Sequence, residues 1–215
     1  VGGTAAMLAA AARWGARRFL YVSSGAVYGA SRPEPRREGE PLTSPATPYG
    51  QAKRRAEALV ATAPGLETVR ARGFAFIGPG LPLDGSYAAG DLLKEAARGG
   101  PLTLRSTGAS VRTYLDAQEA GRWLAVMLAA GEPGTAYNLG GGLPLTVAML
   151  AGLVAKIAGL GPAAVVLGPD TATDSYVPDL SSVRERLGLS PQVPLADSVV
   201  AALRWVRAGA PGARA

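Results

Sequence analysis

The stretch FLYVSSGAVYG, residues 19–29, decides the fold class of this chain, together with PYGQAK at residues 48–53. The first four residues of the former stretch are apolar or aromatic, which is typical of a buried β-strand. Two serines follow at the end of this strand. A helix is expected at 49–63, because Thr47 is a suitable N-cap residue and Pro48 is favoured at the first helical position. The sequence therefore predicts a strand, a loop and a helix in this order.

Strands and helices alternate along the rest of the chain. Alternating apolar strands and helices predict a parallel sheet that is covered by helices. We expect helices at 4–14, 49–63, 88–98, 116–130, 145–158, 180–187 and 195–207, and strands at 18–23, 67–72, 102–104, 113–115, 136–139 and 163–167.

The composition excludes several functions. The chain has 215 residues, no cysteine and no histidine. Disulfides and thiolate metal sites are therefore excluded, and no metal site is expected. The net charge is +6, but the arginines are scattered and form no basic block with aromatic residues, so we expect no nucleic-acid partner. No apolar run is long enough for a transmembrane helix, and we expect a cytoplasmic protein without a membrane partner.

The hydroxyl and amine groups that remain suit proton transfer. Tyr49 and Lys53 are four residues apart on the expected helix, so their side chains project from one face. An ammonium about 4 Å from a phenolate stabilises it by on the order of 4 kcal/mol in a protein-like dielectric. Such a pair can accept a proton from an alcohol, and Ser24 can hydrogen-bond the same alcohol. A lysine at this spacing is often only a solvated neighbour, so the order of strand, serines, loop and helix carries the interpretation.

With these motifs in place, the sequence resembles the extended short-chain dehydrogenase/reductases, in particular the NAD-dependent epimerase/dehydratases of nucleotide sugars. The resemblance covers essentially the whole chain. It rests on VGGTAAMLAAA (1–11), FLYVSSGAVYG (19–29), PYGQAK (48–53), RGFAFIGPG (72–80), VRTYLDAQEAGRWL (111–124), AYNLGGGLPLTVAMLAGLV (136–154) and VPDLSSVRERLGLSPQVPLADSV (177–199).

The resemblance implies a Rossmann-like doubly wound parallel sheet and a smaller mixed α/β substrate region. On this basis residues 1–75 are the C-terminal part of a dinucleotide-binding core with the catalytic residues, and 76–215 are an interleaved substrate-binding region. It also implies that Tyr49 is the general base, that Lys53 stabilises its phenolate and holds the cofactor ribose, and that Ser23 lies at the cofactor.

The resemblance further implies a set of substrate contacts. Ser24 orients the sugar hydroxyl, and Arg112 contacts the nucleotide phosphates. Asn138 is expected at the substrate end, although a role in a turn is an equal alternative. Tyr28 is a further candidate near the sugar, with core packing as the stronger alternative. Ala75 stands where many members have an asparagine that contacts the diphosphate, which leaves the identity of the substrate open.

Besides Ala75, the sequence departs from the family pattern in two further ways. The phosphate-binding G-x-x-G-x-x-G motif is absent from residues 1–215, and the family places it before the position of residue 1. We therefore expect an N-terminally truncated Rossmann domain, which uses NAD or NADP if the full-length protein contains that motif. Gly25 and Ala26 occupy the places of the Asp-Glu pair of the 4,6-dehydratases, so dehydration by that route is not expected.

Three functions remain open. The first is an NAD-dependent nucleotide-sugar epimerase, the second is a non-catalytic binding protein for a nucleotide sugar or a partner on the same scaffold, and the third is an NADP-dependent sugar reductase. The family leads us to expect a homodimer through the helices at 4–14 and 49–63. The open edge of the strand at 18–23 predicts marginal stability of this chain alone, or association through that edge.

Overall fold

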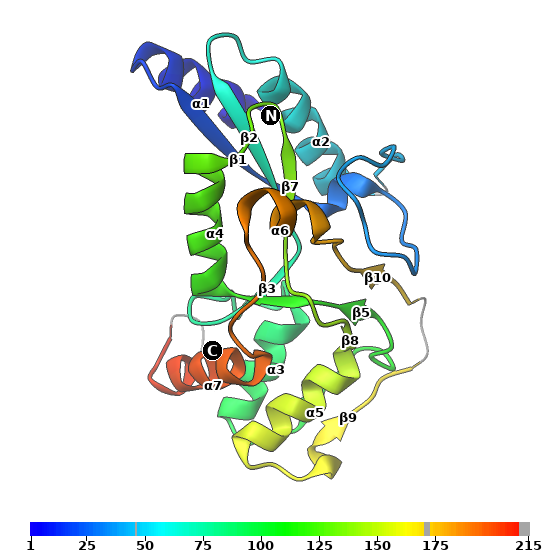
Figure 1. Ribbon diagram of the computed structural model, residues 1–215. Helices are drawn as coiled ribbons and strands as arrows, with labels where there is room; N and C mark the ends of the chain where they lie inside the picture. Colours follow the sequence, from blue (N-terminus) through cyan, green and yellow to red (C-terminus); the bar gives the residue numbers. More distant parts are fainter. Residues whose placement is uncertain (46, 170–172, 211–215) are drawn as a thin grey trace. The chain divides into compact units, whose positions relative to one another are not determined.

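The computed structural model describes residues 1–45, 47–169 and 173–210, and it divides them between two compact units (Figure 1). Unit 1 consists of Val1–Phe74, Ala120–Gly140 and Tyr176–Ser190. Unit 2 consists of Ala75–Glu119, Gly141–Ser175 and the residues from Pro191 on. Each unit thus combines three separate parts of the chain, and the expected functional division into 1–75 and 76–215 stays a prediction.

Unit 1 is built on a parallel three-stranded sheet in the order β1-β2-β7. The expected α/β class with a Rossmann-like parallel sheet is confirmed. β1 lies at an edge of this sheet within the described part of the chain, and the expected association through that edge stays a prediction. The elements are β1 (Arg18–Ser24), β2 (Glu67–Gly73), β7 (Ala136–Leu139), α1 (Gly2–Arg13), η1 (Gly25–Tyr28), α2 (Pro48–Ala61), α4 (Ala117–Ala130) and α6 (Ser181–Leu187).

Helical segments lie on both faces of the sheet, as the contacts of alternate β2 side chains show. Arg72 bonds Glu57 of α2, so the face that carries Arg72 is covered by α2. Tyr21 of β1 lies on that same face, with its ring 5.2 Å from Lys53 Nζ. Val69 points to the other face, where a Cβ built on Gly131, just after α4, would lie 3.1 Å from it. The catalytic candidates on α2 therefore share one layer with α1, which packs against α2.

Unit 2 has a core of small aliphatic residues between three helices. Leu93 of α3, Leu150 and Val154 of α5 and Val199 of α7 are all completely buried. Short strands pair around these helices: β3 with β6 and β4 with β9 in parallel, and β5 with β8 antiparallel. The elements are α3 (Ala88–Ala97), α5 (Val147–Ala158), α7 (Leu195–Arg207), β3 (Ala75–Ile77), β4 (Leu102–Thr103), β5 (Val111–Arg112), β6 (Tyr114–Asp116), β8 (Leu145–Thr146), η2 (Pro162–Ala164) and β9 (Val165–Val166), and β10 (Ser175–Tyr176) lies at the unit boundary.

The expected helices and strands are all present, with ends that mostly differ by one or two residues, and two of the differences have a clear physical cause. The helix expected at 145–158 begins at Val147, because Thr146 caps it by accepting a hydrogen bond from Met149 N, while Leu145 and Thr146 form a strand. The strand expected at 163–167 is reduced to Val165–Val166, because Pro162 begins a short 3₁₀ turn just before it.

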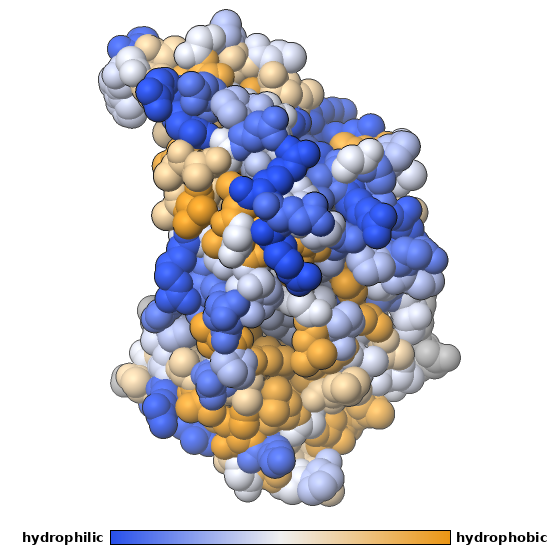
Figure 2. All heavy atoms as spheres, in the orientation of Figure 1, coloured by the Kyte–Doolittle hydropathy of each residue, from blue (hydrophilic) through white to orange (hydrophobic). Residues whose placement is uncertain are grey.

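Apolar side chains are exposed on part of the surface of unit 2. Figure 2 shows apolar side chains gathered over the part of unit 2 around α3 and α5, and Met149 at the start of α5 is 61% exposed. Among the described residues, no helix combines the length and the hydropathy that a membrane span requires. The same part of the chain has no acidic cluster suited to a metal ion.

Candidate active site

The first turns of α2 carry the candidate proton-transfer residues in one stripe. Thr47 caps the helix by accepting a hydrogen bond from Gly50 N, as predicted, and Pro48 occupies the first turn. Tyr49 is 57% exposed, and Glu57, eight residues further along the same face, is only 3% exposed. Lys53 lies between them and is half-buried. The stripe thus runs from solvent at the tyrosine into the protein at the glutamate.

The ammonium group of Lys53 lies between two tyrosine rings. Its Nζ is 5.8 Å from the ring centroid of Tyr49 and 5.2 Å from that of Tyr21. Nζ also donates a 2.8 Å hydrogen bond to the Val22 carbonyl of β1. This bond holds the ammonium group against β1. The structure therefore brings the predicted tyrosine and lysine together.

Gly50 allows α2 to begin directly against the turn that follows β1. A Cβ atom at Gly50 would lie 2.7 Å from the Ala26 carbonyl oxygen and 2.8 Å from Pro45 Cβ. Only a residue without a side chain permits this approach without a shift of backbone. Because Ser24 caps the turn at Ala26, the contact places the serine segment beside the segment of Tyr49.

The Ser24 hydroxyl is held by one neighbouring residue and by one that is distant in the sequence. Its Oγ accepts a 3.2 Å hydrogen bond from Ala26 N and lies 3.1 Å from the hydroxyl of Tyr176. Tyr176 donates in turn to the Gly73 carbonyl at 3.2 Å, and its ring packs on Phe74 with a centroid distance of 4.6 Å. This frame fixes the position of the serine hydroxyl at the end of β1.

Ser23 is buried at the end of β1. The residue is 4% exposed, and its Oγ makes no hydrogen bond to the described part of the protein. Buried hydroxyls are normally hydrogen-bonded, so an orphaned group of this kind needs a partner. A polar group of a bound cofactor is such a partner, and Ser23 therefore fits the expected cofactor contact.

Tyr28 and Asn138 form a buried pair. Tyr28 is 1% exposed and donates a 2.7 Å hydrogen bond to Asn138 Oδ1, and Asn138 is completely buried. Asn138 Nδ2 donates to the carbonyls of Arg36 and Asp179 at 2.7 and 3.0 Å. Every polar atom of this amide is thus used within the protein. A substrate contact by either residue stays a prediction, because the structure gives both side chains internal partners.

Charged groups complete the surroundings of this pair. Burial raises the pKa of the Tyr28 hydroxyl above its ordinary value, although Arg72, whose guanidinium lies 4.8 Å from the ring centroid, opposes the shift. Burial likewise raises the pKa of the Glu38 carboxyl, which accepts a 2.7 Å hydrogen bond from Asn138 N. Tyr28 is therefore a neutral hydrogen-bond donor, which is what Asn138 Oδ1 requires.

We expect Tyr28→Phe to destabilise unit 1 by about 1–3 kcal/mol, because it leaves Asn138 Oδ1 buried without a donor. Chemical unfolding monitored by circular dichroism measures the change. Tyr87→Phe, at an exposed tyrosine of unit 2, is the matched control and should change stability by less than about 0.5 kcal/mol. Equal effects of the two substitutions would contradict the role of the buried bond.

The remaining predicted residues, Arg112 and Ala75, lie in unit 2. Arg112 of β5 forms an ion pair with Asp174, with 2.8 Å between Nη2 and Oδ1. Ala75 opens β3 opposite Tyr114 and is half-buried. The contribution of Arg112 and Ala75 to a common site with Tyr49 of unit 1 stays a prediction.

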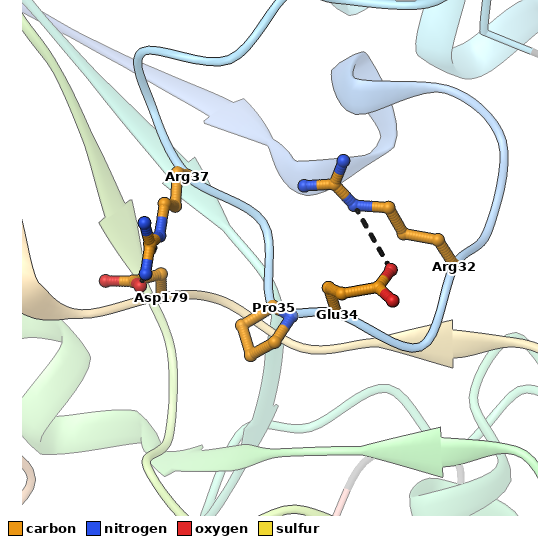
Figure 3. Close-up of a pocket in the computed structure, with 5 residues that line it drawn as sticks. All are labelled: Arg32, Glu34, Pro35, Arg37 and Asp179. Carbon is orange, nitrogen blue, oxygen red and sulfur yellow. Dashed lines mark hydrogen bonds and ion pairs between the residues drawn. The ribbon is translucent and has the colours of Figure 1, made fainter.

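A cavity of about 430 Å³ on unit 1 is lined by none of the predicted site residues (Figure 3). Its walls carry two ion pairs, Arg32 with Glu34 and Arg37 with Asp179, beside Pro35. The charges of its two arginines and two carboxylates therefore cancel. Such a cavity offers no net charge to an anionic ligand, and we assign it no part of the chemistry.

Three residues around the site were not predicted from the sequence. Glu57 follows Lys53 at the same four-residue spacing, so the helical repeat of α2 could have identified it. Tyr21 lies on the face of β1 toward α2, which strand alternation could have shown once the pairing was known. Tyr176 is 152 residues from Ser24, and no local pattern connects the two.

Fold and site together define a class: an α/β protein whose parallel sheet ends in serine hydroxyls beside a helix with a Tyr-x-x-x-Lys pair. A profile described as the NAD dependent epimerase/dehydratase family matches residues 1–140. The chain belongs to this family.

The chain is also similar to individual dehydratases. A dTDP-glucose 4,6-dehydratase of Streptomyces niveus is 30% identical over 216 residues, which is 95% of this chain and 62% of the relative. The crystal structure of DesIV, a dTDP-glucose 4,6-dehydratase of Streptomyces venezuelae with NAD bound, is 29% identical with a TM-score of 0.85, covering 96% of this chain and 65% of that chain.

A more distant structure shows the fold alone. The UDP-glucose 4-epimerase of Thermotoga maritima with UDP-glucose is 24% identical with a TM-score of 0.85, covering 96% of this chain and 68% of that chain. The chain spans less than two thirds of the length of the dehydratases of Streptomyces niveus and Streptomyces griseus that it matches.

Proposed function

We propose that the protein is an NAD- or NADP-dependent oxidoreductase of the epimerase type that acts on a carbon of a nucleotide sugar. The observation that carries the proposal is the Tyr49–Lys53 pair of α2, whose helix start abuts the turn that holds Ser24. Family membership supports the same reaction class. DesIV, at 29% identity, contains NAD in its crystal structure, which supports the choice of cofactor.

The residues of this chain have distinct roles in the proposal. Tyr49 accepts the proton of the sugar hydroxyl, because its side chain is exposed and the Lys53 ammonium stabilises the resulting phenolate. Ser24 donates a hydrogen bond to the oxygen of the reacting alcohol or carbonyl when its hydroxyl turns from that of Tyr176. Lys53 and Ser23 hold the cofactor, since Ser23 Oγ is buried and has no hydrogen-bond partner among the described residues. NAD, when bound, supplies the hydride acceptor.

The packing around Gly25 supports epimerisation or reduction rather than 4,6-dehydration. A Cβ at Gly25 would lie 2.8 Å from Phe74 Cζ and 2.8 Å from the Tyr176 hydroxyl. An acidic side chain at this position would therefore collide with the Phe74 ring and the Tyr176 hydroxyl unless these side chains moved. The place that the resemblance assigns to the aspartate of the dehydratases is filled here by the frame of Ser24.

A homodimer through α1 and α2 is part of the same proposal. Met7 and Trp14, in and directly after α1, are 55% and 77% exposed, and Leu59 of α2 is 38% exposed. These apolar side chains give two neighbouring helices a surface that a second copy can cover.

The proposal is tested by incubating the full-length protein with NAD and either UDP-glucose or dTDP-glucose, and following the sugar by NMR. We expect a product that is epimerised or oxidised at a ring carbon and that retains its C6 hydroxyl. A 4-keto-6-deoxy product would overturn the assignment against dehydration. Tight binding of the nucleotide sugar without NAD binding or turnover would instead establish a non-catalytic binding protein.

A further inference from the structure

Arg112, the proposed phosphate contact, already has an anionic partner within unit 2. Its Nη2 donates to both carboxylate oxygens of Asp174, at 2.8 Å to Oδ1 and 3.0 Å to Oδ2. Nη1 donates to the main-chain carbonyl of Asp174 at 3.3 Å. The carboxylate thus occupies Nη2, a donor that a phosphate group would use.

The main chain holds Asp174 against β5. Val111 N donates a 2.9 Å hydrogen bond to the Asp174 carbonyl, and Asp174 N donates to Ser110 Oγ at 3.3 Å. On the arginine side, Nη1 also donates to the Val111 carbonyl at 2.9 Å. Both partners of the ion pair are therefore tied to the same short strand, and the carboxylate remains beside the guanidinium even when the ion pair opens.

We propose that Asp174 is an internal competitor that sets the affinity of Arg112 for the diphosphate of a nucleotide. This inference rests on the proposed function, which assigns the diphosphate to Arg112. A diphosphate binds by displacing the Asp174 carboxylate from Nη2, and the negative charge that stays nearby repels the ligand. The site consequently holds nucleotide diphosphates less tightly than an unopposed arginine would.

The exposure of the pair makes this displacement feasible. The side chain of Asp174 is 47% exposed and that of Arg112 is 25% exposed. Ion pairs with this access to water contribute little to stability, because water and salt screen them. A ligand that carries two negative charges can therefore replace the carboxylate, at a cost that shows in its dissociation constant.

The experiment is a calorimetric titration of the full-length protein with UDP and with dTDP at fixed ionic strength. We expect Asp174→Asn to lower both dissociation constants by about fivefold, which corresponds to an exposed ion pair of about 1 kcal/mol. Binding of uridine and thymidine, which lack the diphosphate, should not change. Asp197→Asn removes the same charge from an exposed position of α7 and should leave all four ligands unaffected.

Arg112→Gln separates this inference from the proposed function. It should weaken diphosphate binding about tenfold or more, and D174N should give no gain in the R112Q background. If R112Q weakens binding but D174N does not improve it, Asp174 is no competitor, while the proposed phosphate contact stands. If R112Q has no effect, or if neither the wild type nor D174N binds, the phosphate contact and the competitor both fail, and the product analysis alone decides the reaction class.

Discussion

Tyr49→Phe should lower kcat of the full-length protein by about 10²–10⁴-fold, the usual contribution of a positioned general base. Phenylalanine keeps the ring and its packing but has no oxygen that can accept the proton of the sugar hydroxyl. Because Tyr49 is 57% exposed, the loss of its hydroxyl leaves no buried group without a partner, and stability should stay unchanged. Steady-state rates with the nucleotide sugar and NAD, together with thermal unfolding, measure both effects.

Tyr21→Phe is the matched control for this substitution. The Tyr21 ring centroid is closer to Lys53 Nζ than that of Tyr49, at 5.2 Å against 5.8 Å, but Tyr21 belongs to β1 and not to α2. Burial raises the pKa of the Tyr21 hydroxyl, so the phenolate that could take up a proton forms less readily at this residue. We expect kcat to change less than threefold. A larger loss in Tyr21→Phe than in Tyr49→Phe would move the role of base to β1.

The part of the site that lies on α2 could be predicted from the sequence because its geometry is local. A helical repeat places Tyr49, Lys53 and Glu57 on one face whatever the rest of the protein does. The cap at Thr47 and the first-turn proline likewise depend on neighbouring residues only. The parallel sheet followed from apolar strands that alternate with helices, and the structure confirms it.

The partners of the other predicted residues depend on tertiary pairing and were not predictable. Asn138 lies 110 residues from Tyr28, and its amide also reaches Arg36 and Asp179. Asp174 reaches Arg112 across 62 residues through bonds of the main chain to β5. Sequence motifs identified these positions through a family resemblance. That resemblance indicates which residue types recur at these positions. It does not indicate which other groups of the protein bind their side chains.

The buried ion pair between Arg72 and Glu57 should give the largest effect on stability. Nε and Nη2 of Arg72 donate to the two carboxylate oxygens of Glu57 at 3.0 and 2.9 Å, and the side chains are only 5% and 4% exposed. Burial opposes the charge of Arg72, yet Glu57 and Tyr28 raise the pKa of its guanidinium above the ordinary value. Removal of one partner leaves the other charge buried and uncompensated. We expect Arg72→Met and Glu57→Leu each to cost about 3–5 kcal/mol.

The double substitution Arg72→Met with Glu57→Leu should recover most of that loss, because an apolar pair of similar volume needs no compensation for charge. Denaturant unfolding of the two single variants and the double variant yields the coupling free energy directly. Arg186→Met, in the exposed ion pair with Glu132, is the control and should cost less than about 1 kcal/mol. Additive losses in the double variant would mean that the two side chains stabilise unit 1 through packing alone. Recovery would show that the charge pair joins α2 to β2, and so holds the helix that positions Tyr49 and Lys53.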